Sequence, residues 1–146
     1  MSDLLRNACT FLFVPATQPE RLHKALASQA DMVIADWEDA VPPADKAQAR
    51  EALVAAVQTL SAAQRARLLV RINAAGSAWF DGDVQALARL VGQGMAGAVV
   101  PKSESPAQLA VIAEQAGAAC ALVALVETVA GIDALDALAR APQVQR

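Results

Sequence analysis

Five short apolar runs, each followed by a longer stretch with helical periodicity, constrain the fold of this chain more than any other feature. We expect these runs to be strands, at residues 11–14, 32–36, 68–72, 97–100 and 121–126. Each is almost continuously apolar, as in strands buried on both faces of a parallel sheet. Parallel strands need crossover connections, and the intervening segments are long enough to supply them as helices. The pattern predicts five successive βα units in a single α/β domain, residues 1–146.

The segments between the runs carry helix start and stop signals. Thr17 is expected to cap a helix with a proline in its first turn and Glu20 as a capping-box partner. Ser105 precedes a second helix in the same way, and Gly117 is expected to end it. Asp45 is the candidate cap of a third helix. The last predicted helix carries four apolar residues: Ile132, Leu135, Leu138 and Ala139.

Two architectures accept such a string of units. One is an open, doubly wound sheet of flavodoxin type, which suits a chain of 146 residues. The other is the first part of an eight-stranded (β/α)₈ barrel, which needs at least about 200 residues when complete. Length favours the open sheet, whereas the residues at the strand ends favour the barrel.

Composition excludes several classes of partner. The net charge is -3 and only 3% of the residues are aromatic, so the basic surface and stacking platform of nucleic-acid binders are missing. The longest apolar run, residues 118–126, is too short to span a membrane, and we see no signal peptide. The two cysteines, Cys9 and Cys120, are far apart and are expected to be buried free thiols. We therefore expect a cytoplasmic protein without a nucleic-acid or membrane partner.

Charged residues follow four consecutive predicted strands. Glu38 and Asp39 come after the second, Arg71 lies near the end of the third, Lys102 follows the fourth, and Glu127 follows the fifth. Ligands bind at the carboxyl ends of parallel strands in both open α/β sheets and barrels. We therefore expect these side chains to converge on an anionic ligand or a metal ion.

The side-chain types suggest a chemistry for this edge of the sheet. Carboxylates at Glu38, Asp39 and Glu127 suit Mg²⁺, which takes only one or two protein carboxylates and keeps several waters. Arg71 offers a planar fork for a substrate carboxylate, which together with a metal indicates a small keto acid or hydroxy acid. Two plainer interpretations stay open: Arg71 forms an ion pair with Asp36 or Glu38, and Glu127 caps the following helix.

Other candidates carry less weight. Lys102 is a candidate Schiff-base lysine, with a solvated or ion-paired side chain as the plainer alternative. His23, the only histidine, falls in the middle of a predicted helix and is expected to lie on the surface. The glycine-rich segment 92–97 precedes a strand, which is the wrong context for a phosphate-binding loop.

Taken together and in order, the strand-end motifs resemble the citrate lyase β-subunit-like family, within the HpcH/HpaI aldolase group. The resemblance covers nearly the whole chain. The matching segments are LFVP at 12–15, PER at 19–21, DMVIADWEDAV at 31–41, VRIN at 70–73, PKSES at 101–105 and LVET at 125–128. The sequence departs from the family pattern at Ala16, Trp37 and Ser103, where the family commonly has Gly, Leu and Val.

The resemblance implies a Mg²⁺-dependent carbon–carbon lyase that cleaves citryl-, malyl- or citramalyl-CoA by a retro-Claisen step. The products would be an acyl-CoA and a small keto acid. Arg71 would hold the keto-acid carboxylate, and Glu38 and Asp39 would bond metal-bound water or the substrate. Glu127 would ligate Mg²⁺ and contact the substrate. A second metal carboxylate would follow the sixth barrel strand, beyond residue 146, and the protein is expected to be a homo-oligomer.

An incomplete barrel has physical consequences. It leaves two sheet edges unpaired and one apolar sheet face uncovered. We therefore expect a fragment of a longer lyase, inactive as the isolated chain and with weak metal affinity. Pairing with another chain, a non-catalytic lyase-like structural or interaction subunit, and a Schiff-base aldolase acting through Lys102 are the alternatives.

Overall fold

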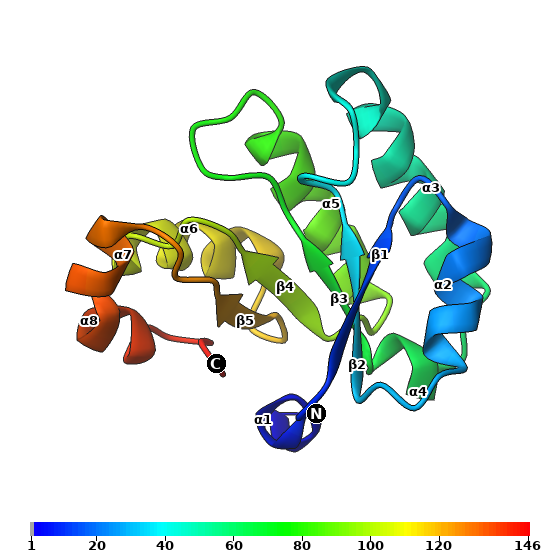
Figure 1. The fold of residues 1–146 in the computed structure, drawn as a ribbon, viewed down its shortest axis with the longest axis horizontal. Helices are drawn as coiled ribbons and strands as arrows, with labels where there is room; N and C mark the ends of the chain where they lie inside the picture. Colours follow the sequence, from blue (N-terminus) through cyan, green and yellow to red (C-terminus); the bar gives the residue numbers. More distant parts are fainter. Residues whose placement is uncertain (1) are drawn as a thin grey trace.

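The strands form one parallel sheet in the order β1-β2-β3-β4-β5 (Figure 1). The computed structural model describes residues 2–146. All five predicted strands are present: β1 (Phe11–Pro15), β2 (Met32–Asp36), β3 (Leu68–Arg71), β4 (Gly97–Val100) and β5 (Ala121–Ala124). The flavodoxin-like alternative is wrong, because that fold places its strands in the order 2-1-3-4-5. Sequential order is the topology of a (β/α)₈ barrel, and the chain forms its first five βα units.

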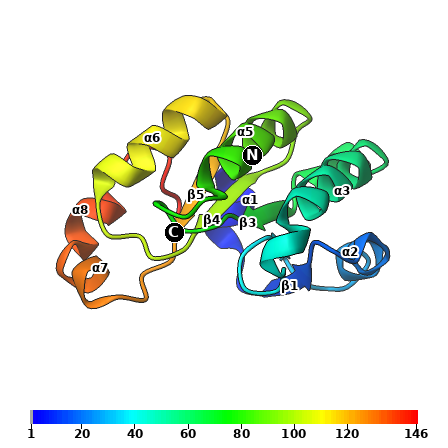
Figure 2. The ribbon, with the colours of Figure 1, turned by 90° about the horizontal axis from the view of Figure 1, so that it is seen from above.

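Right-handed crossovers between sequential strands place the connecting helices on one side of the sheet. The helices α2 (Pro19–Leu26), α3 (Lys46–Gln58), α5 (Phe80–Gly92) and α6 (Pro106–Ala116) follow the outer, convex side of the sheet (Figure 2). Short elements complete the chain: α1 (Ser2–Asn7), the 3₁₀ turn η1 (Pro43–Asp45), α4 (Ala62–Arg65), α7 (Val129–Asp133) and α8 (Leu135–Ala139).

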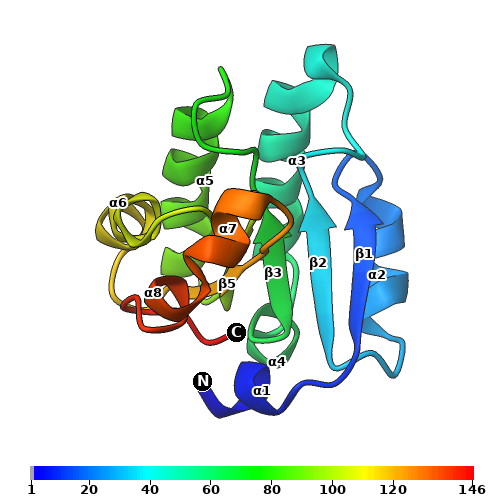
Figure 3. The same cartoon turned by 60° about the vertical axis from the view of Figure 1, so that its left-hand side comes forward.

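Strand alternation divides the core into two clusters. In β2, Val33 and Ala35 face the helices, and in the neighbouring strand β3 Leu68 and Val70 do the same. The opposite, inner face carries a smaller apolar cluster that α1 covers at the amino ends of the strands (Figure 3). Its buried members are Leu5, Ala8, Met32, Ile34, Leu69, Ala96 and Val99. The carboxyl ends of the strands are left open at the other end of the inner face.

The helix signals are confirmed in part. Ser105 caps α6 by accepting a hydrogen bond from the Gln108 backbone N–H at 3.3 Å, and Gly117 ends that helix with φ of 90°. The cap at Thr17 is wrong, because the chain enters α2 one residue later at Gln18, and no side chain bonds the first turn there. Asp45 holds the cap position of α3 without a side-chain hydrogen bond.

The prediction of one continuous helix at the end of the chain is wrong. The chain breaks it at Ala134 into α7 and α8. Leu138 is buried, whereas Ile132 and Leu135 are 63% and 53% exposed. Nothing within residues 2–146 covers that apolar face, so packing does not hold one straight helix together.

The final residues run beside β5. Val144 forms an isolated parallel bridge with Leu122, and the Gln145 backbone N–H donates to the Leu122 carbonyl at 2.8 Å. Residues 143–146 thus occupy the place of a sixth parallel strand. Both cysteines are free, but Cys9 is exposed in the loop before β1, so only Cys120 is buried as expected. Within residues 2–146, no helix is long and apolar enough to cross a membrane.

Candidate active site at the carboxyl ends of the strands

Arg71 and Asp36 form the centre of the cluster at the carboxyl ends. They are register partners on the neighbouring strands β3 and β2, so their side chains emerge side by side. Arg71 donates from Nε to Asp36 Oδ1 at 2.8 Å and from Nη2 to Asp36 Oδ2 at 2.6 Å. This bidentate pair is the ion-pair interpretation of Arg71, and it occupies one edge of the guanidinium fork.

The other edge of the guanidinium faces the loop after β2, residues 37–40, which we call the acidic loop. Arg71 Nη1 lies 3.2 Å from Glu38 Oε2 and 3.3 Å from Asp39 Oδ2, and the ring of Phe13 lies 5.0 Å from the guanidinium carbon. Burial opposes ionisation of Asp36, but hydrogen bonds from Arg71 and from the Glu38 backbone N–H outweigh it and lower the pKa of Asp36. The bond to Asp36 in turn raises the pKa of Arg71. The pair is therefore ionised at neutral pH.

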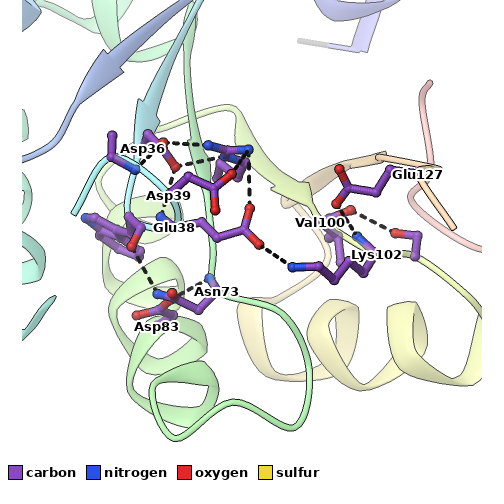
Figure 4. A network of polar contacts seen from close by, with 12 residues as sticks. Asp36, Glu38, Asp39, Asn73, Asp83, Val100, Lys102 and Glu127 are labelled. Carbon is purple, nitrogen blue, oxygen red and sulfur yellow. Dashed lines mark hydrogen bonds and ion pairs between the residues drawn. The ribbon is translucent and has the colours of Figure 1, made fainter. Parts of the chain in front are cut away.

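Lys102, in the turn after β4, adds a second cation to the cluster of Asp36, Arg71 and Glu38. Its Nζ lies 3.0 Å from Glu38 Oε1, so Glu38 is held between a lysine and an arginine (Figure 4). The hydrogen bond to Glu38 raises the pKa of Lys102, which keeps the amine protonated. Schiff-base formation needs a neutral amine, so this environment disfavours the aldolase alternative.

Glu127 approaches the same network from the loop after β5. Its Oε1 accepts the backbone N–H of Lys102 at 3.0 Å, and Lys102 has a left-handed backbone with φ of 47°. Among residues 2–146, no donor bonds to Oε2 of Glu127. The interpretation of Glu127 as a helix cap is wrong, because Thr128 caps α7 by accepting the Gly131 backbone N–H at 3.1 Å.

Gly131 allows α7 to pack closely against the turn after β4. A Cβ at Gly131 would lie 2.6 Å from the backbone oxygen of Ser103 and 3.3 Å from the Thr128 hydroxyl. Only a glycine therefore lets the first turn of α7 pack against the turn after β4. This close packing brings the loop of Glu127 beside the loop of Lys102.

The donor set fits Mg²⁺ as one part of a site. No group of three or more His, Cys, Asp or Glu side chains within residues 2–146 could hold a metal ion. Glu38 and Asp39 are engaged by cations, whereas Glu127 is exposed and keeps one carboxylate oxygen. Mg²⁺ requires only one or two protein carboxylates and completes its shell with water, so Glu127 suits one ligand position.

Sequence reasoning missed a polar cluster behind the acidic loop, formed by the buried Lys46, Asn73 and Asp83 and the partly buried Arg50. Asp83 and Lys46 are 0% and 5% exposed. Burial lowers the pKa of Lys46, and the nearby carboxylates of Asp83 and Asp36 act in the opposite direction. The sequence does contain a signal, because Lys46 shares the buried face of its helix with apolar residues. His23, in contrast, is exposed as predicted.

Comparison with known proteins agrees with this geometry. The family model of HpcH/HpaI aldolase/citrate lyase matches residues 10–146. A citrate lyase subunit beta-like protein of Mycobacterium tuberculosis is 41% identical over 121 residues, which cover 83% of this chain and 39% of the relative. An L-malyl-CoA/beta-methylmalyl-CoA lyase of Cereibacter sphaeroides is 38% identical over 96 residues, which cover 66% of this chain and 30% of that lyase.

Solved structures give the same result. CitE of Mycobacterium tuberculosis in complex with magnesium and pyruvate has a TM-score of 0.78 and 39% identity, covering 96% of this chain and 53% of that one. CitE in complex with magnesium, acetoacetate and coenzyme A has a TM-score of 0.77 and 39% identity. The match covers 95% of this chain and 47% of that one. The chain thus spans 39% or less of the two curated relatives and about half of these structures. Its matched residues, strand order and fold show that it belongs to the HpcH/HpaI aldolase/citrate lyase family.

Proposed function

We propose that this chain is the N-terminal part of a Mg²⁺-dependent lyase barrel that cleaves a 3-hydroxyacyl-CoA thioester into an acyl-CoA and a small keto acid. The observation that carries the proposal is the continuous polar network from Asp36 through Arg71, Glu38 and Lys102 to Glu127. It lies at the carboxyl ends of four neighbouring strands, where barrel enzymes hold their substrates. The related lyases and the ligands named for the CitE structures supply the substrate class.

Arg71 is the proposed anchor for the keto-acid carboxylate. One edge of its guanidinium is committed to buried Asp36, so the substrate would use the other edge, which Nη1 and the second hydrogen of Nη2 form. There it would replace Asp39, whose side chain is 78% exposed and whose ion pair is correspondingly weak. Asp36 then acts as the fixed partner that orients the fork.

Glu127 is the proposed metal ligand, with Glu38 and Asp39 bonding metal-bound water or the substrate. Bound Mg²⁺ would polarise the substrate oxygens and stabilise the negative charge that develops on them. Lys102 orients two of these carboxylates. Its backbone N–H donates to Glu127, and its Nζ donates to Glu38. The second protein carboxylate is proposed to come from the remaining barrel wall, so the isolated chain should bind Mg²⁺ weakly and turn over negligibly.

The test is cleavage of citryl-, malyl- and citramalyl-CoA by the protein isolated from its source, with its intact mass measured on the same sample. We expect a mass near that of a complete barrel and cleavage of at least one thioester, abolished by a chelator and restored by Mg²⁺. Arg71→Lys should remove the activity, because a lysine cannot form the bidentate pair. Arg21→Lys on the exposed face of α2 is the matched control.

A non-catalytic lyase-like subunit is the second candidate. It is favoured by the ion pair that Arg71 already forms with Asp36, which occupies one edge of the guanidinium. A source protein of 15.1 kDa that cleaves none of the three thioesters and binds neither Mg²⁺ nor pyruvate would support it and contradict the lyase.

A further inference from the structure

The buried ammonium of Lys46 lies directly behind the acidic loop. Its Nζ donates to the backbone carbonyls of Trp37 and Glu38 at 2.7 and 2.6 Å and to Asn73 Oδ1 at 2.7 Å. These three acceptors use all three hydrogens of the ammonium. Two of them are consecutive carbonyls of the segment that carries Glu38.

Asn73, in the loop after β3, and Asp83, on α5, connect this ammonium to the rest of the fold. The Asn73 amide donates to Asp83 Oδ2 at 2.7 Å and to the Trp37 carbonyl at 3.2 Å, and its backbone N–H donates to the same Asp83 oxygen at 2.7 Å. Asp83 Oδ1 pairs with Arg50 Nη1 at 2.9 Å. Lys46 offers only donors, and Trp37 O and Asp83 offer only acceptors. One orientation of the Asn73 amide therefore satisfies the whole group.

The same loop is held from its other side by Asp36. The backbone N–H groups of Glu38 and Ala40 donate to the Asp36 carboxylate at 2.9 and 3.1 Å. The loop thus has its N–H groups tied to Asp36 and its carbonyls tied to Lys46. The side chain of Glu38 contacts Arg71 and Lys102. Figure 4 shows it extending from the loop toward Lys102.

We propose that Lys46 is a positioning residue, which holds the backbone of Glu38 so that its carboxylate stays between Arg71 and Lys102. Asn73 and Asp83 orient Lys46 for this purpose and touch none of the proposed substrate-binding groups. The role deepens the proposed function, and only its catalytic consequence rests on that function. The positioning itself is a property of the unliganded chain.

Hydrogen exchange measured by NMR on the unliganded source protein tests the role. Lys46→Met keeps the apolar stem and removes the three donors. We expect the amides of Glu38 and Ala40 to exchange at least about tenfold faster, while ladder amides of β3 and β4, such as Val70 and Val99, change by less than about threefold. The Arg71 Nε–H resonance should shift as well, because its partner Asp36 holds the released loop.

Lys24→Met on the exposed face of α2 is the matched control and should leave both sets of amides unchanged. Equal acceleration of loop and ladder amides would mean that Lys46 only stabilises the fold, and would overturn the proposal. If Lys46→Met does not fold, Asn73→Ala replaces it, and the exchange rates of loop and ladder amides are compared in the same way. We then expect a smaller acceleration that is still confined to the loop amides. In the wild type, the Lys46 ammonium should give a slowly exchanging ¹H–¹⁵N signal, and its absence would contradict the buried geometry.

A separate titration with Mg²⁺ and pyruvate, on the source protein, distinguishes this inference from the proposed function. Loop-confined acceleration without any Mg²⁺ or pyruvate binding would refute the lyase and leave the positioning role of Lys46 intact. Binding that is unaffected by Lys46→Met, together with unchanged loop exchange, would refute the positioning role and leave the lyase.

Discussion

The two halves of the site are built differently. At the ends of β2 and β3, the side chains of Asp36 and Arg71 are only 4% and 13% exposed and are bonded on several sides. At the ends of β4 and β5, Lys102 has a side chain that is 53% exposed, and Glu127 is also exposed. The first half is completed within this chain, whereas the second half is open to solvent.

The difference follows from what lies behind each pair of strands. The long helices α3 and α5 back β2 and β3. Lys46 of α3 bonds the loop directly, and Asp83 of α5 holds Asn73, which bonds Lys46. Behind β4 and β5 lie α6 and the short helices α7 and α8, and α7 leaves Val129 and Ile132 77% and 63% exposed. Charged groups tolerate burial only where neighbours satisfy all their hydrogen bonds, so the covered half is rigidly prearranged and the open half is not.

The largest effect should come from breaking the buried half. Asp36→Ala leaves Arg71 without its bidentate partner and frees the amides of the acidic loop, and we expect a loss of about 3–5 kcal/mol in the free energy of unfolding. Urea denaturation measures it. Glu127→Gln, in the open half, should change the stability by less than about 0.5 kcal/mol. Equal losses in the two variants would contradict the division into two halves.

Apolar packing should show the same contrast within the last helices. Leu138 is 1% exposed and Ile132 is 63% exposed. Leu138→Ala should cost about 2–4 kcal/mol through lost burial and the remaining cavity. Ile132→Ala should cost less than about 0.5 kcal/mol. Thermal denaturation of both variants checks the pair, and a large loss for Ile132→Ala would show that this face is covered in solution.

Lowering the pH should reduce the free energy of unfolding through Asp36, by less than the Asp36→Ala substitution does. The pKa of Asp36 is lowered from its ordinary value of 3.8, so the native state favours the ionised form. Its contribution is fully present above pH 3.8 and is lost as the pH falls through the lower native value. The loss should be smaller than in Asp36→Ala, because a protonated carboxyl still accepts hydrogen bonds. Urea midpoints between pH 7 and pH 2 should fall less steeply in Asp36→Asn than in the wild type.

Among the acidic residues that contact Arg71, the smallest effect is expected at the exposed Asp39. Asp39 pairs with Arg71 at 3.3 Å, but its side chain is 78% exposed. Asp39→Asn should therefore change the stability by less than about 1 kcal/mol, and added salt should reduce the difference further. Denaturation at low and high salt measures both quantities. A loss as large as that of Asp36→Ala would mean that Asp39 holds Arg71 in place.

Much of the arrangement was predictable because it depends on local pattern. Apolar runs located all five strands, and the charged residues after them located the network of Glu38, Arg71, Lys102 and Glu127. The sequence could not rank the partners of Arg71, because Asp36, Glu38 and Asp39 all lie within reach. Nor did local pattern reveal that α7 and α8 are separate, since a helical repeat does not report whether anything packs against it.

The sequence by itself determined the βα alternation and the edge of the sheet where the charged residues gather, because both follow from short-range periodicity and from parallel strand direction. Only the tertiary structure decided that Asp36 takes the fork of Arg71, since this depends on the register between strands 35 residues apart. It also decided that Lys46 lies buried behind Glu38. A lysine is stable there only because two carbonyls of the acidic loop and the amide oxygen of Asn73 converge on it, and that convergence is a property of the packed chain.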